Sequence, residues 1–188
     1  MDTVAPAMAA FDEPDFTRFD FWAVVVGEGI AVVDTEHRET CLAWLRREDY
    51  GVESIDFGQG IGPATIAIRE MLRWEEQFGP PADPENLNLN ALDDGFDFDL
   101  RPGEGKTLEL RNADVAYRED REWFLGLLSI AHGHSIEHLA LGARFFTVLV
   151  LDPGSRLIGK QYESACVPLP WVLGHPDHPF GPAPVGPA

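Results

Sequence analysis

The stretch RFFTVLVLD, residues 144–152, is almost continuously apolar and contains several β-branched residues. Such a run is typical of a strand buried on both faces, as in a parallel sheet covered by helices. Two shorter strand-like segments precede it, YGVESIDF (50–57) and KTLELRN (106–112). Segments with helical periodicity separate the three. Strands that alternate with helices predict an α/β layered fold with a small, largely parallel sheet packed by helices.

The N-terminal third predicts a β-hairpin followed by a helix. In FWAVVVGEGIAVVD (21–34), two apolar runs flank the turn-forming Gly27-Glu28-Gly29. EHRETCLAWLRRE (36–48) then has helical periodicity, with Asp34 or Thr35 as its predicted cap. Further helices are predicted at 64–78, in a short segment near 88–94, and along 117–142. Three regions follow from this pattern: a flexible N-terminus (1–15), one α/β domain (16–174) and a Pro/Gly-rich tail (175–188).

The charge balance limits the classes of partner. The 188 residues include 32 acidic and 14 basic side chains, for a formal net charge of -18. Such a surface repels nucleic acid and anionic membranes, so direct binding to either is not expected. It favours a basic protein partner or serves solubility alone. The N-terminus lacks the basic start and apolar run of a signal peptide, and the two cysteines lie far apart, which predicts a cytoplasmic protein.

Motifs for catalysis are weak. The chain has no GxSxG and no HExxH sequence, and its GQGIG segment (58–62) lacks the lysine of a phosphate-binding P-loop. The segment HGHSIEH (132–138) places His134 and His138 one helical turn apart, so a zinc site is conceivable, with His132 beside it. A solvated or half-buried helix face is the favoured interpretation. The prediction is therefore a protein that is not an enzyme and needs no metal or cofactor.

The most unusual segment is PADPENLNLNALDDGFDFDL (81–100). Residues 74–100 contain eight acidic residues and no Lys or Arg. A short helix here would turn Leu89 and Leu92 inward and leave its polar residues in solvent, with Asn88 as its N-cap. Asp94 would lie near the helix C-terminus, where a carboxylate opposes the macrodipole. Because this placement does not help the free protein, it indicates a binding role, and a solvated helix-loop face is the alternative interpretation.

The segment NLNLNALDD (86–94), which follows a helix and a Gly/Pro loop, resembles the signature of barstar-like proteins, the inhibitors of barnase-type ribonucleases. In that family a strand leads into a helix, then a loop and a short Asn-capped helix. A strand, a further helical region and a last strand complete the fold. Residues 52–151 can be read in that order. The resemblance implies a barstar-like core at 51–152, with 21–50 as an N-terminal hairpin and helix extension.

Each position of the family motif can be matched to a residue of this sequence. Asn88, Leu89 and the pair Ala91-Leu92 match the family's Asn, Leu and Ala-Leu, and Asp94 matches its final Asp. Asn90 stands where the type protein has an Asp, and Asp93 stands where it has a Trp. The family also uses a Glu five residues before a Gly, a spacing that Glu137 and Gly142 share. The predicted partner-binding residues are Asn88, Asn90, Asp93 and Asp94, with Glu85 and Glu137 as candidates for the rim.

The implied function is an intracellular inhibitor or immunity protein that binds a basic ribonuclease or nuclease toxin. Asp94 would imitate a substrate phosphate in the nuclease active site, and Asp93 would supply a second anion. Two alternatives stay open. The first is an interaction or regulatory module on the same fold without a nuclease target, which the N-terminal extension favours. The second is a small metal-dependent enzyme that uses His132, His134 and His138.

Overall fold

The computed structural model describes residues 10–12, 15, 18–81, 83, 87–96, 98–152, 154–158, 161–162 and 165–166. The predicted tail and most of the predicted flexible N-terminus lie outside these residues. Along the chain the elements are α1 (Phe19–Phe21), η2 (Trp22–Val26), β1 (Ile30–Asp34), η3 (Thr35–His37), α2 (Arg38–Arg47), β2 (Tyr50–Asp56), α3 (Ile61–Met71), α4 (Trp74–Phe78), α5 (Leu89–Gly95), β3 (Gly105–Arg111), α6 (Ala113–Glu119), α7 (Arg121–Ala140), β4 (Arg144–Leu151), β5 (Gln161–Tyr162) and β6 (Ala165–Cys166).

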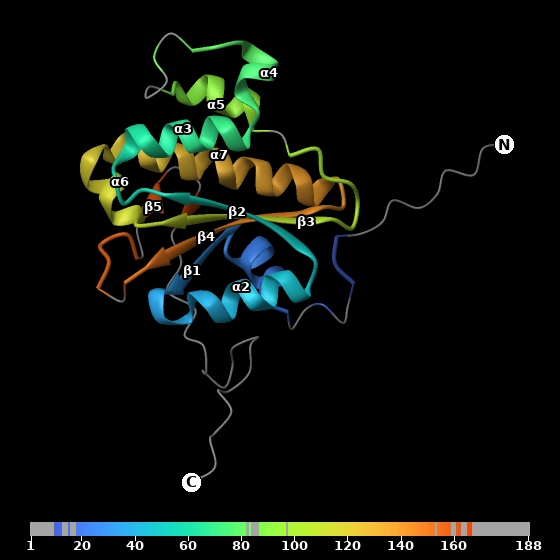
Figure 1. The fold of residues 1–188 in the computed structure, drawn as a ribbon. Helices are drawn as coiled ribbons and strands as arrows, with labels where there is room; N and C mark the ends of the chain where they lie inside the picture. Colours follow the sequence, from blue (N-terminus) through green and yellow to red (C-terminus); the bar gives the residue numbers. More distant parts are fainter. Residues whose placement is uncertain are drawn as a thin grey trace, which may run out of the picture.

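Four strands form one parallel sheet in the order β1-β4-β3-β2. β2, β3 and β4 are successive neighbours, whereas β1 lies at the opposite edge from β2, so α2 crosses the whole sheet between them (Figure 1). The predicted α/β fold with a largely parallel sheet is confirmed at this level. A separate antiparallel pair, β5 and β6, follows.

Helices cover both faces of this sheet. In Figure 1, α3 to α7 lie on one side of the strands, and α2 with the N-terminal helical turns lies on the other. Each layer encloses its own apolar cluster. Phe145 and Leu149 of β4 point into the first cluster, and Phe146 and Val148 point into the second. The central strand is therefore apolar along its length because both of its faces are buried.

The predicted hairpin at 21–34 is wrong. Residues Trp22–Val26 form a π-helical turn, and Ile30–Asp34 joins the main sheet parallel to β4. Ala23 is buried against the second face of the sheet, which stabilises the helical conformation. Gly29 has φ of +80° and lies so close to α7 that an added Cβ would come within 2.4 Å of Ser135. This turn therefore serves to bring the chain into β1 instead of closing a hairpin.

A buried ionic cluster ties the N-terminal turns to the sheet. The Asp20 carboxylate is fully buried and accepts hydrogen bonds from Arg18 at 2.8 and 3.0 Å and from the Tyr50 hydroxyl at 2.6 Å. Arg144 of β4 lies 3.4 Å away. The hydrogen bond to Asp20 raises the pKa of Arg18, and burial followed by the Asp20 charge raises the pKa of Tyr50. The segment before β1 is thus held to two strands by one carboxylate.

The buried thiol of Cys41 in α2 gives a first testable prediction. Burial raises its pKa to about 12, and the charge of Glu109 adds to this rise. Because the thiolate is the reactive form, we expect iodoacetamide at about pH 8 to leave Cys41 unmodified in the folded protein and to alkylate it after unfolding in guanidinium. Peptide mass spectrometry measures the modified fraction. Equal alkylation rates in the folded and unfolded protein would contradict the buried position.

The length and polarity of the helices can be compared with what a membrane-spanning helix requires. In the part of the chain that the structure describes, no helix combines the length and the apolar character needed to cross a bilayer.

Candidate functional site

The acidic helix predicted from the sequence is α5. Asn88 is its N-cap, with extended backbone angles and a side-chain oxygen that accepts a hydrogen bond from the Asn90 amide at 2.9 Å. This bond satisfies one of the amides that a helix N-terminus leaves without a partner. Asn88 therefore fixes where the helix begins, as the sequence predicted.

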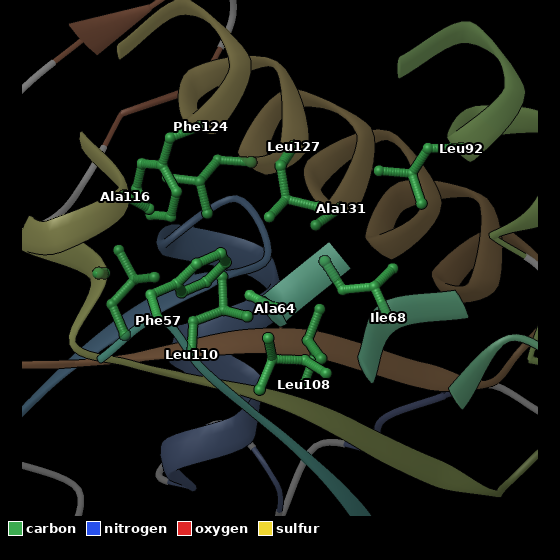
Figure 2. Packing of buried hydrophobic residues seen from close by; sticks show 14 of the residues in the cluster. Phe57, Ala64, Ile68, Leu92, Leu108, Leu110, Ala116, Phe124, Leu127 and Ala131 are labelled. Atoms are coloured by element: carbon green, nitrogen blue, oxygen red, sulfur yellow. The ribbon is translucent and has the colours of Figure 1, made fainter. Parts of the chain in front are cut away.

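Three close contacts hold α5 against the helical layer. Leu92 is fully buried, and Figure 2 shows its side chain within the cluster that includes residues of α7. Leu89 packs so closely on Gly126 of α7 that a Cβ there would lie 2.4 Å from its Cδ1 atom. At the other end of the helix, Gly95 lies under Trp74 of α4, where a Cβ would meet the indole at 3.0 Å. α5 is thus fixed at its start, middle and end.

The loop before α5 has an anchor of its own. The Trp123 indole Nε1 of α7 donates a hydrogen bond to the Leu87 carbonyl at 3.1 Å, and Leu87 is buried. This bond positions the chain one residue ahead of the Asn88 cap. Together with the packing of Leu89 and Leu92, it makes α5 a preorganised surface element, so little ordering entropy is lost when a partner binds.

The outer face of α5 carries exposed polar groups. Asn88, Asn90 and Asp94 are exposed, and the Asp93 side chain is 63% exposed. Asp93 and Asp94 lie in the last turn, which contains no basic residue. The partial negative charge of the helix C-terminus therefore adds to that of the two carboxylates. The result is a concentrated anionic surface on a rigid support.

His134 of α7 connects two of the predicted binding residues. Its Nε2 atom lies 3.2 Å from the Asp93 carbonyl oxygen and 3.4 Å from the Asp93 carboxylate. Its Nδ1 atom lies 3.4 Å from the carboxylate of Glu137, which is 71% exposed. The ring also stacks on Phe96 with centroids 5.2 Å apart. Asp93 and Glu137, 44 residues apart in sequence, are therefore brought to one surface by a histidine between them.

The three histidines of α7 do not form a common site. His132 is buried with Nδ1 2.5 Å from the Glu28 carbonyl oxygen, and His138 is buried beside Phe145. His134 points to α5 instead. Among the described residues there is no group of three His, Cys, Asp or Glu side chains arranged to hold a metal ion. The remaining predicted binding residue, Glu85, lies outside the described residues.

Apart from the α5 surface, a polar hollow lies at the carboxyl ends of the strands, where α/β proteins commonly bind ligands. It measures about 290 Å³ and is lined partly by Arg38, Arg111 and Arg118. Arg38 binds the buried Glu109 carboxylate at 2.6 and 2.9 Å, and Arg111 lies 3.0 Å from Asp56. Arg38 and Arg111 therefore neutralise carboxylates of the fold, whereas the Arg118 Nε donates a hydrogen bond to the Asp114 carbonyl oxygen at 3.1 Å. The Asp94 side chain of α5, in contrast, is exposed, and Asp93 is 63% exposed although His134 lies 3.4 Å from its carboxylate. We therefore take α5 as the stronger candidate site.

The Leu89–Gly126 contact gives a second prediction. Replacing Gly126 with leucine is expected to push α5 away from α7 and to lower the free energy of unfolding by about 1–3 kcal/mol, because extra volume in a packed contact forces strain. Amide hydrogen exchange in α5 is expected to accelerate. Gly133→Leu is the matched control, since a Cβ at Gly133 meets nothing within 4 Å. Equal stability and equal exchange in both variants would show that Gly126 does not position α5.

No relative among known proteins was found that supports or contradicts these observations. Searches against protein-family models, curated proteins and solved structures each gave no match.

Proposed function

We propose that this chain is a barstar-like inhibitor, without enzymatic activity, that binds a basic ribonuclease or nuclease toxin and covers its active site with α5. The observation that carries the proposal is the rigid, Asn88-capped helix with two exposed carboxylates in its last turn. Glu137 is held beside it through His134. Asp94 is the main phosphate mimic, Asp93 the second anion, and Asn90 a polar contact.

The negative charge of this chain suits a basic ribonuclease as its target. A ribonuclease active site is a cationic cleft that must hold the phosphates of RNA, so a fixed acidic helix can occupy it in place of the substrate. Residues 74–100 carry no Lys or Arg, and the whole chain has a net charge of -18. Opposite fields on the two proteins accelerate association and make it sensitive to salt. Inhibition in the cytoplasm would protect the RNA of the cell that makes the toxin.

The order of elements also supports the proposal. From β2 to β4 the chain passes through helices α3 and α4, the Asn-capped α5, strand β3 and helices α6 and α7. This is the order that the resemblance to barstar-like proteins implies for residues 52–151. β1 adds a further strand on the far edge of β4.

The test is capture followed by an enzyme assay. Immobilised full-length protein is incubated with lysate of its native cell at low salt, and the bound proteins are eluted with high salt. We expect the eluate to hydrolyse RNA, and added wild-type protein to stop the hydrolysis. An Asp93→Ala/Asp94→Ala variant should neither capture the nuclease nor inhibit it. An eluate without ribonuclease activity would contradict the proposal.

A regulatory interaction module is the second candidate. One observation favours it: Trp22 and Val25 of η2 are 37% and 46% exposed, which leaves apolar surface on the N-terminal turns. The capture experiment separates the two candidates. A partner retained by the Asp93→Ala/Asp94→Ala variant at high salt would place the binding surface outside α5 and support the module.

A further inference from the structure

The polar hollow at the carboxyl ends of the strands lies where two helices leave the sheet on opposite faces. β1 leads through η3 into α2 on one face, and β3 leads directly into α6 on the other, with β4 between the two strands (Figure 1). The hollow is lined from both sides, by Thr35 and Arg38 after β1 and by Asp114 and Arg118 of α6. In open α/β sheets, ligands bind in the crevice at such a change of direction.

The lining of this hollow is rich in arginine although the chain is acidic. Arg38, Arg111 and Arg118 all line it, in a chain with 14 basic residues and a net charge of -18. The position of Arg38 is explained by the fold, because its guanidinium binds the buried Glu109 carboxylate at 2.6 and 2.9 Å. The other two arginines have donors that the fold does not use.

Arg118 has the larger share of these donors. Its Nε atom donates a hydrogen bond to the Asp114 carbonyl oxygen one helical turn earlier, at 3.1 Å. This bond orients the guanidinium on α6. Arg118 forms no ion pair with any residue that the structure describes, so both of its terminal nitrogens can donate to a ligand.

Arg111 at the end of β3 contributes a buried donor. Its Nη2 atom lies 3.0 Å from the Asp56 carboxylate, but its Nε atom is buried and has no hydrogen-bond partner among the described residues. Buried donors are almost always hydrogen-bonded, so an exception in a residue that lines a hollow indicates a ligand acceptor. A ligand oxygen beside Arg111 and Arg118 would satisfy both residues.

Two carboxylates define the rest of the ligand. In the fold each accepts a hydrogen bond from a hydroxyl group at 2.8 Å, Asp152 from Thr35 and Asp114 from Ser155. Their Oδ2 atoms accept no hydrogen bond from the residues described. Because an ionised carboxylate can only accept, these atoms suit hydroxyl groups of a ligand. A simple anion would be repelled by them, whereas an anion that also carries hydroxyl groups would bind both halves of the lining.

We propose that this hollow binds a small phosphorylated polyol, with its phosphate at Arg111 and Arg118 and its hydroxyl groups at Asp114 and Asp152. Guanidinium groups bind phosphate through paired, charge-assisted hydrogen bonds, and a phosphate monoester has three acceptor oxygens to share between two arginines. The volume of about 290 Å³ lies just below the roughly 300–1,000 Å³ typical of sites for small molecules, so the ligand is small.

The probe is glycerol 3-phosphate, titrated into the 15N-labelled full-length protein and followed through the backbone amide and arginine Nε–H chemical shifts. We expect saturable shifts confined to the residues that line the hollow, with the Nε–H signals of Arg111 and Arg118 among them. Glycerol, which lacks the phosphate, is expected to give no saturable shift. Inorganic phosphate is expected to bind more weakly than glycerol 3-phosphate, because it brings no polyol hydroxyl groups to the two aspartates.

Arg118→Gln tests the phosphate end of the site. It is expected to weaken binding of glycerol 3-phosphate about tenfold or more, while the rest of the amide spectrum stays unchanged because Arg118 is exposed. Arg121→Gln is the matched control. It removes the same charge three residues further along the chain, at an exposed position that does not line the hollow, and should bind as the wild type does.

Asp152→Ala tests the hydroxyl end. It removes one acceptor and is expected to reduce the advantage of glycerol 3-phosphate over inorganic phosphate.

Two results would overturn the site: equal binding by Arg118→Gln and Arg121→Gln, or shifts spread over arginines outside the hollow. Equal affinity of the wild type for glycerol 3-phosphate and inorganic phosphate would refute the polyol as the ligand. None of these residues lies on α5, so the site does not depend on the proposed function, and the capture of a nuclease neither supports nor contradicts it.

Discussion

Replacing Asp20 with alanine is expected to lower the free energy of unfolding by about 3–5 kcal/mol, the cost of removing one partner from a buried ion pair. The carboxylate is fully buried and is the shared acceptor for Arg18, Tyr50 and Arg144. Its removal leaves the Tyr50 hydroxyl and Arg144, which is largely buried, without this acceptor. Urea denaturation followed by circular dichroism measures the change.

The matched control for this prediction is Asp15→Ala. Asp15 also faces Arg18, at 3.6 Å, but both side chains of that pair are 26% exposed. Removing it is expected to change the free energy of unfolding by about 1 kcal/mol or less, because surface ion pairs contribute little. If Asp20→Ala were no more destabilising than Asp15→Ala, the N-terminal turns would not be held to the sheet by this cluster.

The sequence predicted the parallel sheet because its central strand is distinctive. The apolar run at 144–152 favours a strand covered on both faces because it is short and rich in β-branched residues. The apolar run at 21–26 was ambiguous, since a short run does not distinguish strand from helix by periodicity. In the structure, the contacts of Ala23 with the second apolar cluster and the turn at Gly29 favour the helical conformation. Neither feature can be recognised from the local sequence.

The helix predicted at 64–78 shows a similar limit. The chain adopts a left-handed conformation at Arg73, with φ of 49°, and so divides into α3 and α4. The break changes the helical phase, so Phe78 of α4 is 49% exposed, whereas Ile68 of α3 is buried. A single non-glycine residue at positive φ carries no reliable signal in the sequence.

The sequence predicted those features of the candidate site that depend on neighbouring residues of the chain. The Asn88 cap and the burial of Leu92 follow from residue type and spacing within α5. The link from Asp93 through His134 to Glu137 depends on how α5 lies on α7, which no spacing within either segment specifies. From the sequence, His134 is interpreted as part of a solvated or half-buried helix face or as a zinc ligand, and neither interpretation predicts this bridge. A helical histidine beside an acidic motif is too common a combination to have indicated this bridge.

The largest functional effect is expected for Asp94→Ala. At the barnase–barstar interface, close charge pairs are coupled by about 1.5–7 kcal/mol, and the proposed complex would use the same type of pair. A loss of only 1.5 kcal/mol already corresponds to about a tenfold weaker complex. We therefore expect the affinity for the captured nuclease to fall at least about tenfold, as measured by titration calorimetry. Its salt dependence should also decrease, because one charge has left the interface.

The loss of affinity should not come from unfolding. Asp94 is exposed in the last turn of α5, where a carboxylate opposes the macrodipole, so its removal is expected to change stability by about 0.5 kcal/mol or less. Glu36→Ala is the control for net charge, since it removes one exposed carboxylate from η3, the turn that leads into α2. If Glu36→Ala weakened binding as much as Asp94→Ala, the partner would respond to overall charge and α5 would not be the inhibitory element.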